Sequence, residues 1–168
     1  MESIEKEKNV IEIIKKAFQT VTRENGTSLH EADVIDGYGS EEEQKEARKL
    51  DKDTHWSEIL DEDIKKFPSI LSFLNPVGWR YHIPAYMIWT IKNYKNSDSF
   101  TVDSTIYDFI LQEEKYLNWC MERFSLLTQE QSRAVAMFLK YMAEDERYCD
   151  APAAKEALDK YWIKFLED

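Results

Sequence analysis

The stretch LSFLNPVGWRYHIPAYMIW, residues Leu71 to Trp89, is rich in aromatic side chains and carries two prolines around a single arginine, Arg80. Two interpretations fit this composition. Either the stretch is the buried centre of the fold, or Trp79, Arg80, Tyr81 and His82 line a pocket or a contact surface. In the first case we expect Arg80 to be partly buried, paired with an acidic side chain and stacked on an aromatic ring. The residues alone do not decide between the two.

The same stretch contains the start of a helix. Asn75 is a favourable N-cap, and Pro76 fits the first helical position, where its missing N–H costs nothing. A proline further inside a helix removes a backbone hydrogen bond and clashes with the preceding turn. We therefore predict a break or kink at His82-Ile83 and a new helix from about Pro84 to Tyr94. Apolar residues surround this second helix on nearly all sides, which predicts a buried central helix.

On the N-terminal side, residues 4–21 place apolar side chains at helical spacing, and Asn25-Gly26 is a typical helix end. A loop region is predicted for residues 27–40. The next helix begins at a capping box, a serine followed three residues later by a glutamate, and covers residues 41–49. A further short helix is predicted for residues 61–66, ended by a following proline.

The second half of the chain favours helices throughout, because no glycine follows Gly78. Apolar stripes at helical spacing recur to the C-terminus, and Thr128 with Gln131 forms another capping box. Only residues 100–102 have the composition of a short strand. The sequence predicts an all-α fold, built as one helical domain over residues 1–168.

The net charge of −11 is concentrated in one part of the chain. Residues 31–63, here called the acidic segment, hold 13 acidic and 4 basic residues, a net charge of −9; the remaining 20 acidic and 18 basic residues give −2. Such a segment repels nucleic acid, whose binding requires Lys and Arg, and attracts basic partners. It also fits a simpler role as a solvated face.

Several separated motifs together resemble a known family. They are DGYGSEEE (Asp36–Glu43), Trp56, LSFLNPVGWRYHIPAYM (Leu71–Met87), RFSLLTQEQSRAVAMFLKYM (Arg123–Met142) and ALDKYW (Ala157–Trp162). The chain is similar to an uncharacterised bacterial family catalogued as a domain of unknown function, with the central signature FLxPxGxRYxxPAY from Phe73 to Tyr86. The resemblance implies a small, mostly helical bacterial protein and carries no catalytic residue, cofactor or substrate.

Common enzyme signatures are missing from the sequence. The three histidines, His30, His55 and His82, are scattered, and neither a nucleophile elbow nor a phosphate-binding glycine loop occurs. A metal site from His30, Asp33 and Asp36 would have a thin ligand set. We expect no metal or organic cofactor, no membrane helix and no signal peptide. The two cysteines indicate reduced thiols in a cytoplasmic protein.

The sequence therefore favours a binding module over an enzyme. An acidic face with aromatic side chains suits recognition of a basic protein, as in an immunity-type inhibitor of a basic toxin. The alternatives are an enzyme or accessory subunit with its site near Arg80, and a homodimeric scaffold. The candidate partner or pocket residues are Tyr38, Glu41, Glu42, Glu43, Trp56, Trp79, Arg80, Tyr81 and His82.

Overall fold

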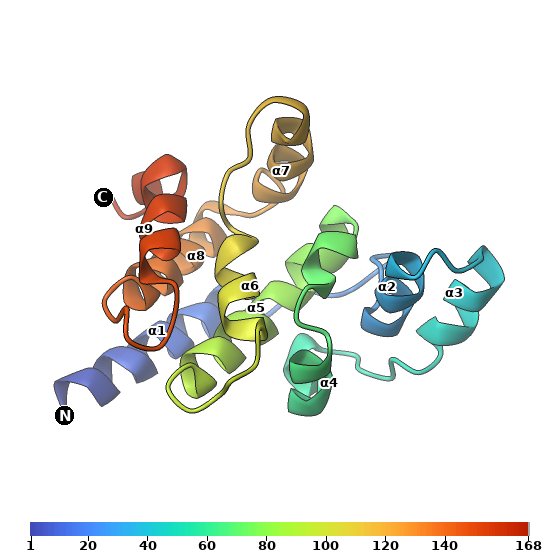
Figure 1. The fold of residues 1–168 in the computed structure, drawn as a ribbon, viewed down its shortest axis with the longest axis horizontal. Helices are drawn as coiled ribbons and strands as arrows, with labels where there is room; N and C mark the ends of the chain where they lie inside the picture. Colours follow the sequence, from blue (N-terminus) through green and yellow to red (C-terminus); the bar gives the residue numbers. More distant parts are fainter. Residues whose placement is uncertain (168) are drawn as a thin grey trace.

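The computed structural model describes residues 1–167, and within this range the secondary structure is helical with no β-strand (Figure 1). The predicted all-α fold class is confirmed. The α-helices of the described range are α1 (Glu2–Ala17), α2 (Leu29–Asp36), α3 (Glu41–Arg48), α4 (Asp61–Lys66), α5 (Pro76–Asn93), α6 (Thr101–Tyr107), α7 (Leu117–Phe124), α8 (Gln129–Met142) and α9 (Ala151–Lys160). Short 3-10 helices lie between or after them: η1 (Trp56–Glu58), η2 (Ile70–Phe73), η3 (Glu114–Tyr116) and η4 (Trp162–Phe165).

Helix α5 passes through the centre of the core. Its residues from Gly78 to Ile91 are buried, with the exception of Arg80. The helix assignment is continuous through Pro84, so a break at His82-Ile83 with a separate second helix is wrong, whereas a kink at this point stays a prediction. An internal proline costs a helix about 3 kcal/mol, and burial of apolar side chains around the whole circumference offsets this cost. The predicted buried helix from Pro84 to Tyr94 is the second half of α5.

Three helix starts follow their sequence signals. The side-chain oxygen of Asn75 accepts a hydrogen bond from the Gly78 N–H at 2.8 Å, at the start of α5. Ser40 accepts from the Glu43 N–H at 3.2 Å, at the start of α3. The capping box at Thr128 begins α8. Local hydrogen bonds of this kind depend on residues close in sequence, which is why the sequence alone predicts them.

The sequence predicted that the first helix would end near Asn25-Gly26. Helix α1 ends earlier, at Ala17. The apolar pattern continues past the helix because Phe18 and Val21 are buried in the core from the turn that follows α1. The carbonyl oxygen of Phe18 also accepts a hydrogen bond from the Trp56 indole at 2.8 Å. Tertiary packing of Phe18 therefore ends α1 earlier in the chain than the local signal at Asn25-Gly26 would.

The predicted loop region, residues 27–40, contains a helix instead. Helix α2 occupies Leu29–Asp36 and begins at Ser28, whose backbone N–H donates to the Glu31 carboxylate at 3.1 Å. This serine–glutamate pair was visible in the sequence and was missed, because the loop prediction rested on the glycines on either side. Turns remain at both ends of the region.

The short strand at residues 100–102 is also a wrong prediction, because these residues lead into α6. The Thr101 hydroxyl donates to the Ile64 carbonyl at 3.0 Å, and the Thr105 hydroxyl donates to the Thr101 carbonyl at 2.7 Å. A short strand is stable only beside a pairing partner, and the described range offers none.

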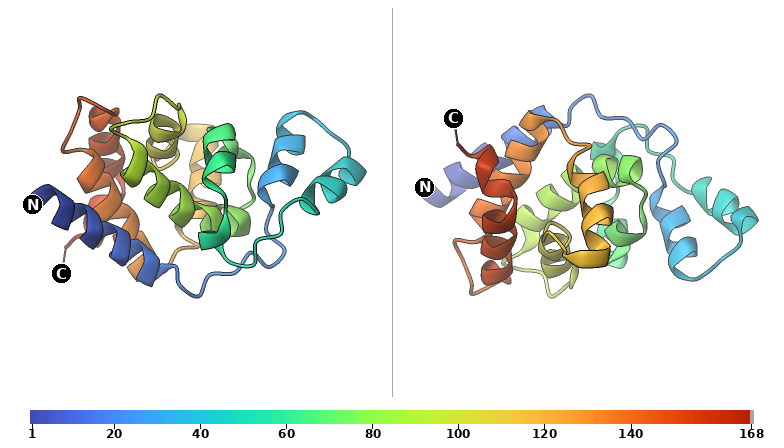
Figure 2. Two further views of the ribbon diagram at one scale, coloured as in Figure 1. Left: turned by 90° about the horizontal axis from the view of Figure 1, so that it is seen from below. Right: turned by 90° about the horizontal axis from the view of Figure 1, so that it is seen from above.

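The helices form a body and a projecting hairpin (Figures 1 and 2). In the body, α8 packs against both α1 and α9 near the two chain termini, and α5 crosses the middle. Helices α2 and α3 pack mainly on each other at the opposite end of the molecule. We call residues 29–48 the acidic hairpin, since both of its helices belong to the acidic segment or border it.

Candidate functional site

The aromatic block around Arg80 is part of the core. Trp79, Tyr81 and His82 are all buried, with at most 1% of each residue exposed. The Trp79 indole N–H donates to the Asp108 carboxylate, and the Nδ1 atom of His82 lies 2.7 Å from the Gly78 carbonyl oxygen. Burial lowers the pKa of His82 to about 4, which keeps the ring neutral at physiological pH. These three candidate residues are out of reach of a partner protein.

Arg80 itself is half-buried and does not have the expected partners. Within residues 1–167 no acidic side chain pairs with it, no aromatic ring stacks on it, and its Nε atom is buried without a hydrogen-bond partner. The expectation of a paired and stacked Arg80 is wrong. Arg23 instead pairs with Asp53 and lies over the Tyr81 ring, and Arg123 stacks on the Trp119 ring without an ion pair in the described residues.

Arg23 belongs to a polar cluster that the sequence did not reveal. Its Nη1 atom lies 3.1 Å from the Asp53 carboxylate, which also accepts a hydrogen bond from the Tyr81 hydroxyl at 2.6 Å. The guanidinium carbon lies 5.7 Å from the centroid of the Tyr81 ring. Burial and the hydrogen bond to Asp53 raise the pKa of Tyr81 far above its usual value. The cluster fastens the segment before η1 to the body and has a structural role.

Arg123 is the buried arginine of the fold. Its guanidinium lies 3.9 Å from the centroid of the Trp119 ring and donates to the carbonyl oxygens of Trp119 and Leu74. The Leu74 carbonyl belongs to the segment that leads into α5, so Arg123 joins α7 to the centre of the core. No sequence motif marks this contact, because Leu74 and Arg123 are 49 residues apart.

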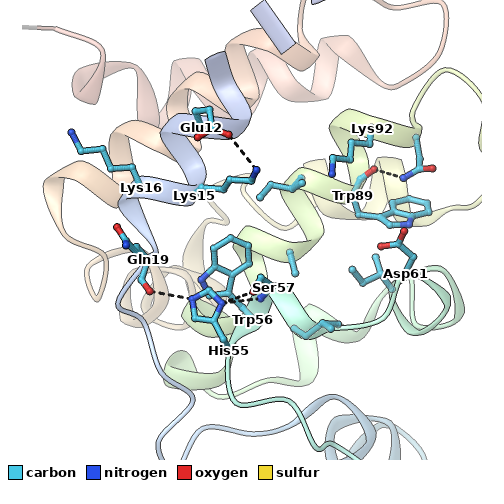
Figure 3. Close-up of a pocket in the computed structure, with 15 residues that line it drawn as sticks. Glu12, Lys15, Lys16, Gln19, His55, Trp56, Ser57, Asp61, Trp89 and Lys92 are labelled. Carbon is cyan, nitrogen blue, oxygen red and sulfur yellow. Dashed lines mark hydrogen bonds and ion pairs between the residues drawn. The ribbon is translucent and has the colours of Figure 1, made fainter. Parts of the chain in front are cut away.

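A groove between α1, η1, α4 and α5 has a volume of about 750 Å³ (Figure 3). Its lining combines apolar side chains with a mixed-charge rim: Ile59, Ile64, Ala85, Ile88, Trp56, Trp89, Glu12, Lys15, Lys16, Gln19, His55, Asp61 and Lys92. Lys15 pairs with Glu12 at 3.2 Å. Because carboxylates accompany the lysines, the rim selects neither an anion nor a cation. Trp56 contributes part of this lining although the residue as a whole is buried.

One end of this groove holds a serine–histidine pair. The Nδ1 atom of His55 accepts from the Ser57 backbone N–H at 3.2 Å and lies 2.7 Å from the Ser57 hydroxyl oxygen (Figure 3). The Nε2 atom lies 3.1 Å from the Gln19 carbonyl oxygen. A catalytic pair needs a free base and a group that orients it. Here both ring nitrogens serve as the N-cap of η1 and as a link to α1, so the pair is structural.

The acidic segment divides into carboxylates that hold the fold and carboxylates that are free. Glu31 accepts from Arg48 Nη1 at 2.7 Å, and Asp51 lies 2.6 Å from the Nδ1 atom of His30. Asp53 belongs to the cluster with Arg23. Exposed carboxylates for which the described residues contain no ion pair lie on the acidic hairpin, at Asp33, Asp36, Glu41, Glu42 and Glu43, and also at Glu58, Asp61 and Glu62 on η1 and α4. The hairpin therefore carries the larger share of the free charge of the acidic segment.

Tyr38 lies at the tip of the acidic hairpin, between α2 and α3, and is 98% exposed. Its backbone is left-handed, with φ 59 degrees. The N–H of Tyr38 donates to the Ile35 carbonyl at 3.0 Å and that of Gly39 to the Val34 carbonyl at 2.8 Å. This is the Schellman pattern of a helix end, in which the left-handed residue is usually glycine. Glycine would adopt the left-handed conformation at position 38 with less backbone strain. The chain nevertheless has a bulky, exposed tyrosine there.

The base of the hairpin is attached firmly to the body. Arg48 Nη1 donates to the Gly26 carbonyl at 2.7 Å in addition to its pair with Glu31. The His30 ring meets the Phe67 ring edge-on, with centroids 5.2 Å apart. These contacts hold the hairpin in one orientation, so that Tyr38 and the free carboxylates form a preorganised surface.

Metal ligation and membrane insertion find no support in the described residues. Within residues 1–167 no group of three or more His, Cys, Asp or Glu side chains is arranged to hold a metal ion. His30 is hydrogen-bonded to Asp51 and does not join Asp33 and Asp36. Across the same range, every helix is too short or too polar to cross a membrane.

Fold and surface define a small all-α protein with a projecting acidic hairpin. Residues 6–166 match the family described as a family of unknown function (DUF6714), and the chain belongs to that family. The predicted membership of a family of unknown function is confirmed. No curated protein and no solved structure matches the chain.

Proposed function

We propose that this protein is a cytoplasmic binding module that contacts a basic surface of another protein through the tip of the acidic hairpin. The observation that carries the proposal is Tyr38, a fully exposed aromatic residue held in a left-handed conformation. Tyrosine is enriched among residues that dominate binding energy, because it buries a large area and loses little side-chain entropy. Tyr38 adds backbone strain to the free protein, and its ring lies exposed at the hairpin tip. This combination fits a role in contacting a partner protein.

The charge distribution supports the same surface. The free carboxylates of α2 and of the first turn of α3 flank Tyr38 in sequence and lie on the same hairpin. Charges of one sign around an aromatic anchor raise the rate of encounter with an oppositely charged partner. In its finer form the proposal is a bacterial immunity-type inhibitor that covers the basic face of a toxin.

The enzyme alternative places its site near Arg80, whose neighbours Trp79, Tyr81 and His82 are core residues, whereas Tyr38 on the hairpin is exposed. The homodimer alternative has no particular face of the described structure in its favour. We therefore retain the contact with a basic partner as the proposed function.

The proposal is tested by affinity capture from the source cell with four versions of the protein. The wild type is compared with Tyr38→Gly, with a Glu41→Lys and Glu42→Lys double variant, and with a control carrying Glu2→Lys and Glu5→Lys. The control changes the net charge equally but lies on α1, away from the hairpin. We expect a basic protein to be recovered with the wild type and the control and lost with both hairpin variants.

Salt provides a second readout. The Debye length falls from about 10 Å at 0.1 M salt to about 3 Å at 1 M, so recovery should fall sharply between the two. Equal recovery of one partner with all four proteins at both salt concentrations would refute the proposal.

A further inference from the structure

A second groove, distinct from the one at α1, lies between η2, α6, η3 and α7 and has a volume of about 700 Å³. We call it the aromatic groove, because Phe100, Tyr107, Tyr116 and Trp119 line it. Phe100 is 55% exposed, Tyr116 52% and Tyr107 38%. Exposed aromatic side chains gathered around one concave surface are typical of a binding site, whereas single exposed apolar residues carry no such meaning.

The groove contains one carboxylate, that of Asp108. One oxygen of Asp108 accepts the indole N–H of Trp79, and no other hydrogen bond to this carboxylate is found within residues 1–167. An ionised carboxylate can accept about four hydrogen bonds. Burial raises the pKa of Asp108 to about 6, although the hydrogen bond from Trp79 and the charge of Arg123 act in the opposite direction. The carboxylate therefore has unused acceptor capacity beside an apolar surface.

The nearby cations do not use this capacity. Arg123 directs its N–H groups to the carbonyl oxygens of Leu74 and Trp119. Lys115, at the rim, lies with its Nζ atom 4.9 Å from the centroid of the Tyr116 ring and makes no ion pair within the described residues. A cation is thus already held over one aromatic face of the groove. The carboxylate makes no ion pair within the described residues, although the positive charge of Arg123 acts on it from a distance.

We propose that the aromatic groove binds a small organic amine, whose cationic nitrogen donates to Asp108 and whose apolar body packs on Phe100, Tyr116 and Trp119. Aromatic rings attract cations through their negative faces, and a carboxylate at the base of the groove adds a directed, charge-assisted hydrogen bond. A carboxylic acid of the same shape would meet Asp108 as a like charge. The site uses none of the residues of the acidic hairpin, so it is independent of the proposed function.

The test is a titration with phenethylamine, followed through the indole N–H signals of Trp79 and Trp119 in heteronuclear NMR spectra. Trp79 reports directly, because its N–H donates to Asp108. The matched probes are phenethyl alcohol, which is neutral, and hydrocinnamate, which is anionic. We expect saturable shifts with phenethylamine. The dissociation constants of the other two probes should be at least about tenfold higher, since a hydrogen bond to a charged group contributes at least a factor of about ten in affinity.

Three variants locate the site. Asp108→Asn should weaken phenethylamine binding about tenfold, and Tyr116→Ala should weaken it while leaving the fold intact, because Tyr116 is exposed. Lys115→Gln should strengthen it by removal of a competing positive charge. If Asp108→Asn does not fold, the Tyr116 and Lys115 variants decide. Equal affinity for the three probes, preference for hydrocinnamate, or no saturable shift with any probe would overturn the proposal.

Discussion

Gly26 and Gly78 lie backbone against backbone, at the point where the chain enters the acidic hairpin and crosses the first turn of α5. A Cβ atom on Gly26 would stand 2.6 Å from the Gly78 nitrogen, and one on Gly78 would stand 2.5 Å from the Thr27 carbonyl oxygen. The reciprocal hydrogen bonds between Thr27 and Asn75, at 3.0 and 3.2 Å, close the same junction. The hairpin is therefore joined to the body through a contact that only glycine permits.

The first prediction concerns this junction. Gly26→Ala should lower the free energy of unfolding by about 2 kcal/mol, because the new methyl group meets backbone atoms that cannot move aside. Gly37→Ala is the matched control, since its added Cβ would have no neighbour closer than 3.6 Å and its φ is −81 degrees. Urea unfolding measures both. Equal effects of the two substitutions would contradict the close approach.

A second prediction separates the two arginines near the core. Arg123→Ala should cost about 3 kcal/mol, because it removes two hydrogen bonds and the stacking on Trp119 from a buried site. Arg80→Ala should cost less than about 1 kcal/mol, since Arg80 is only half-buried and makes no ion pair or ring contact within residues 1–167. Thermal unfolding of both variants under one set of conditions makes the comparison. A larger loss for Arg80→Ala would restore the paired arginine that the sequence suggested.

The third prediction concerns pH. Burial raises the pKa of Asp108 from 3.8 to about 6 in the folded state, so the folded protein binds this proton more tightly than the unfolded chain does. The contribution of Asp108 to the free energy of unfolding is fully present below the pKa of Asp108 in the unfolded chain. It is lost as the pH rises through the pKa of Asp108 in the folded protein. Asp108→Asn keeps an acceptor for the Trp79 indole but carries no charge.

Asp108→Asn should therefore be more stable than the wild type by about 1 kcal/mol near neutral pH, and the difference should disappear near pH 4. The measurement is urea unfolding of both proteins across this range. A constant difference, or a wild type that is the more stable near neutral pH, would show that desolvation does not dominate at this carboxylate.

The last prediction concerns the hairpin tip. Tyr38→Gly should raise the free energy of unfolding by about 1 kcal/mol, because glycine adopts the left-handed conformation without strain. Tyr38→Ala is the control, since alanine retains the Cβ atom and hence most of the strain. Urea midpoints of the two variants provide the comparison. Destabilisation by glycine alone would mean that the Tyr38 ring supports the fold rather than a contact.

Sequence reasoning succeeded where the signals were local. The caps at Ser40, Asn75 and Thr128 each act through residues three positions away, and each predicted helix start is present. The same reasoning failed at Pro84 and at the end of α1. In both cases the predicted effect is local. Burial of α5 on all sides and insertion of Phe18 into the core instead involve contacts from distant parts of the chain, which outweigh the local preference.

The candidate site was predictable only in part. Tyr38 and the glutamates of residues 41–43 could be selected from the sequence, because glycines and a charge run mark an exposed turn. The pairings of Asp53 with Arg23 and of Asp108 with Trp79 join residues that are 30 and 29 positions apart. No spacing rule links residues at such separations, so these contacts could not have been found in advance.

By itself, the sequence determined the all-α class, a buried helix over residues 84–94 and the position of the acidic charge, because each follows from composition and from periods of three or four residues. Only the tertiary structure decided which arginine is buried, which carboxylates are free, and that Trp79, Tyr81 and His82 are core residues. These outcomes depend on which helix faces meet. That choice is made by packing between residues far apart in the chain, which local patterns do not encode.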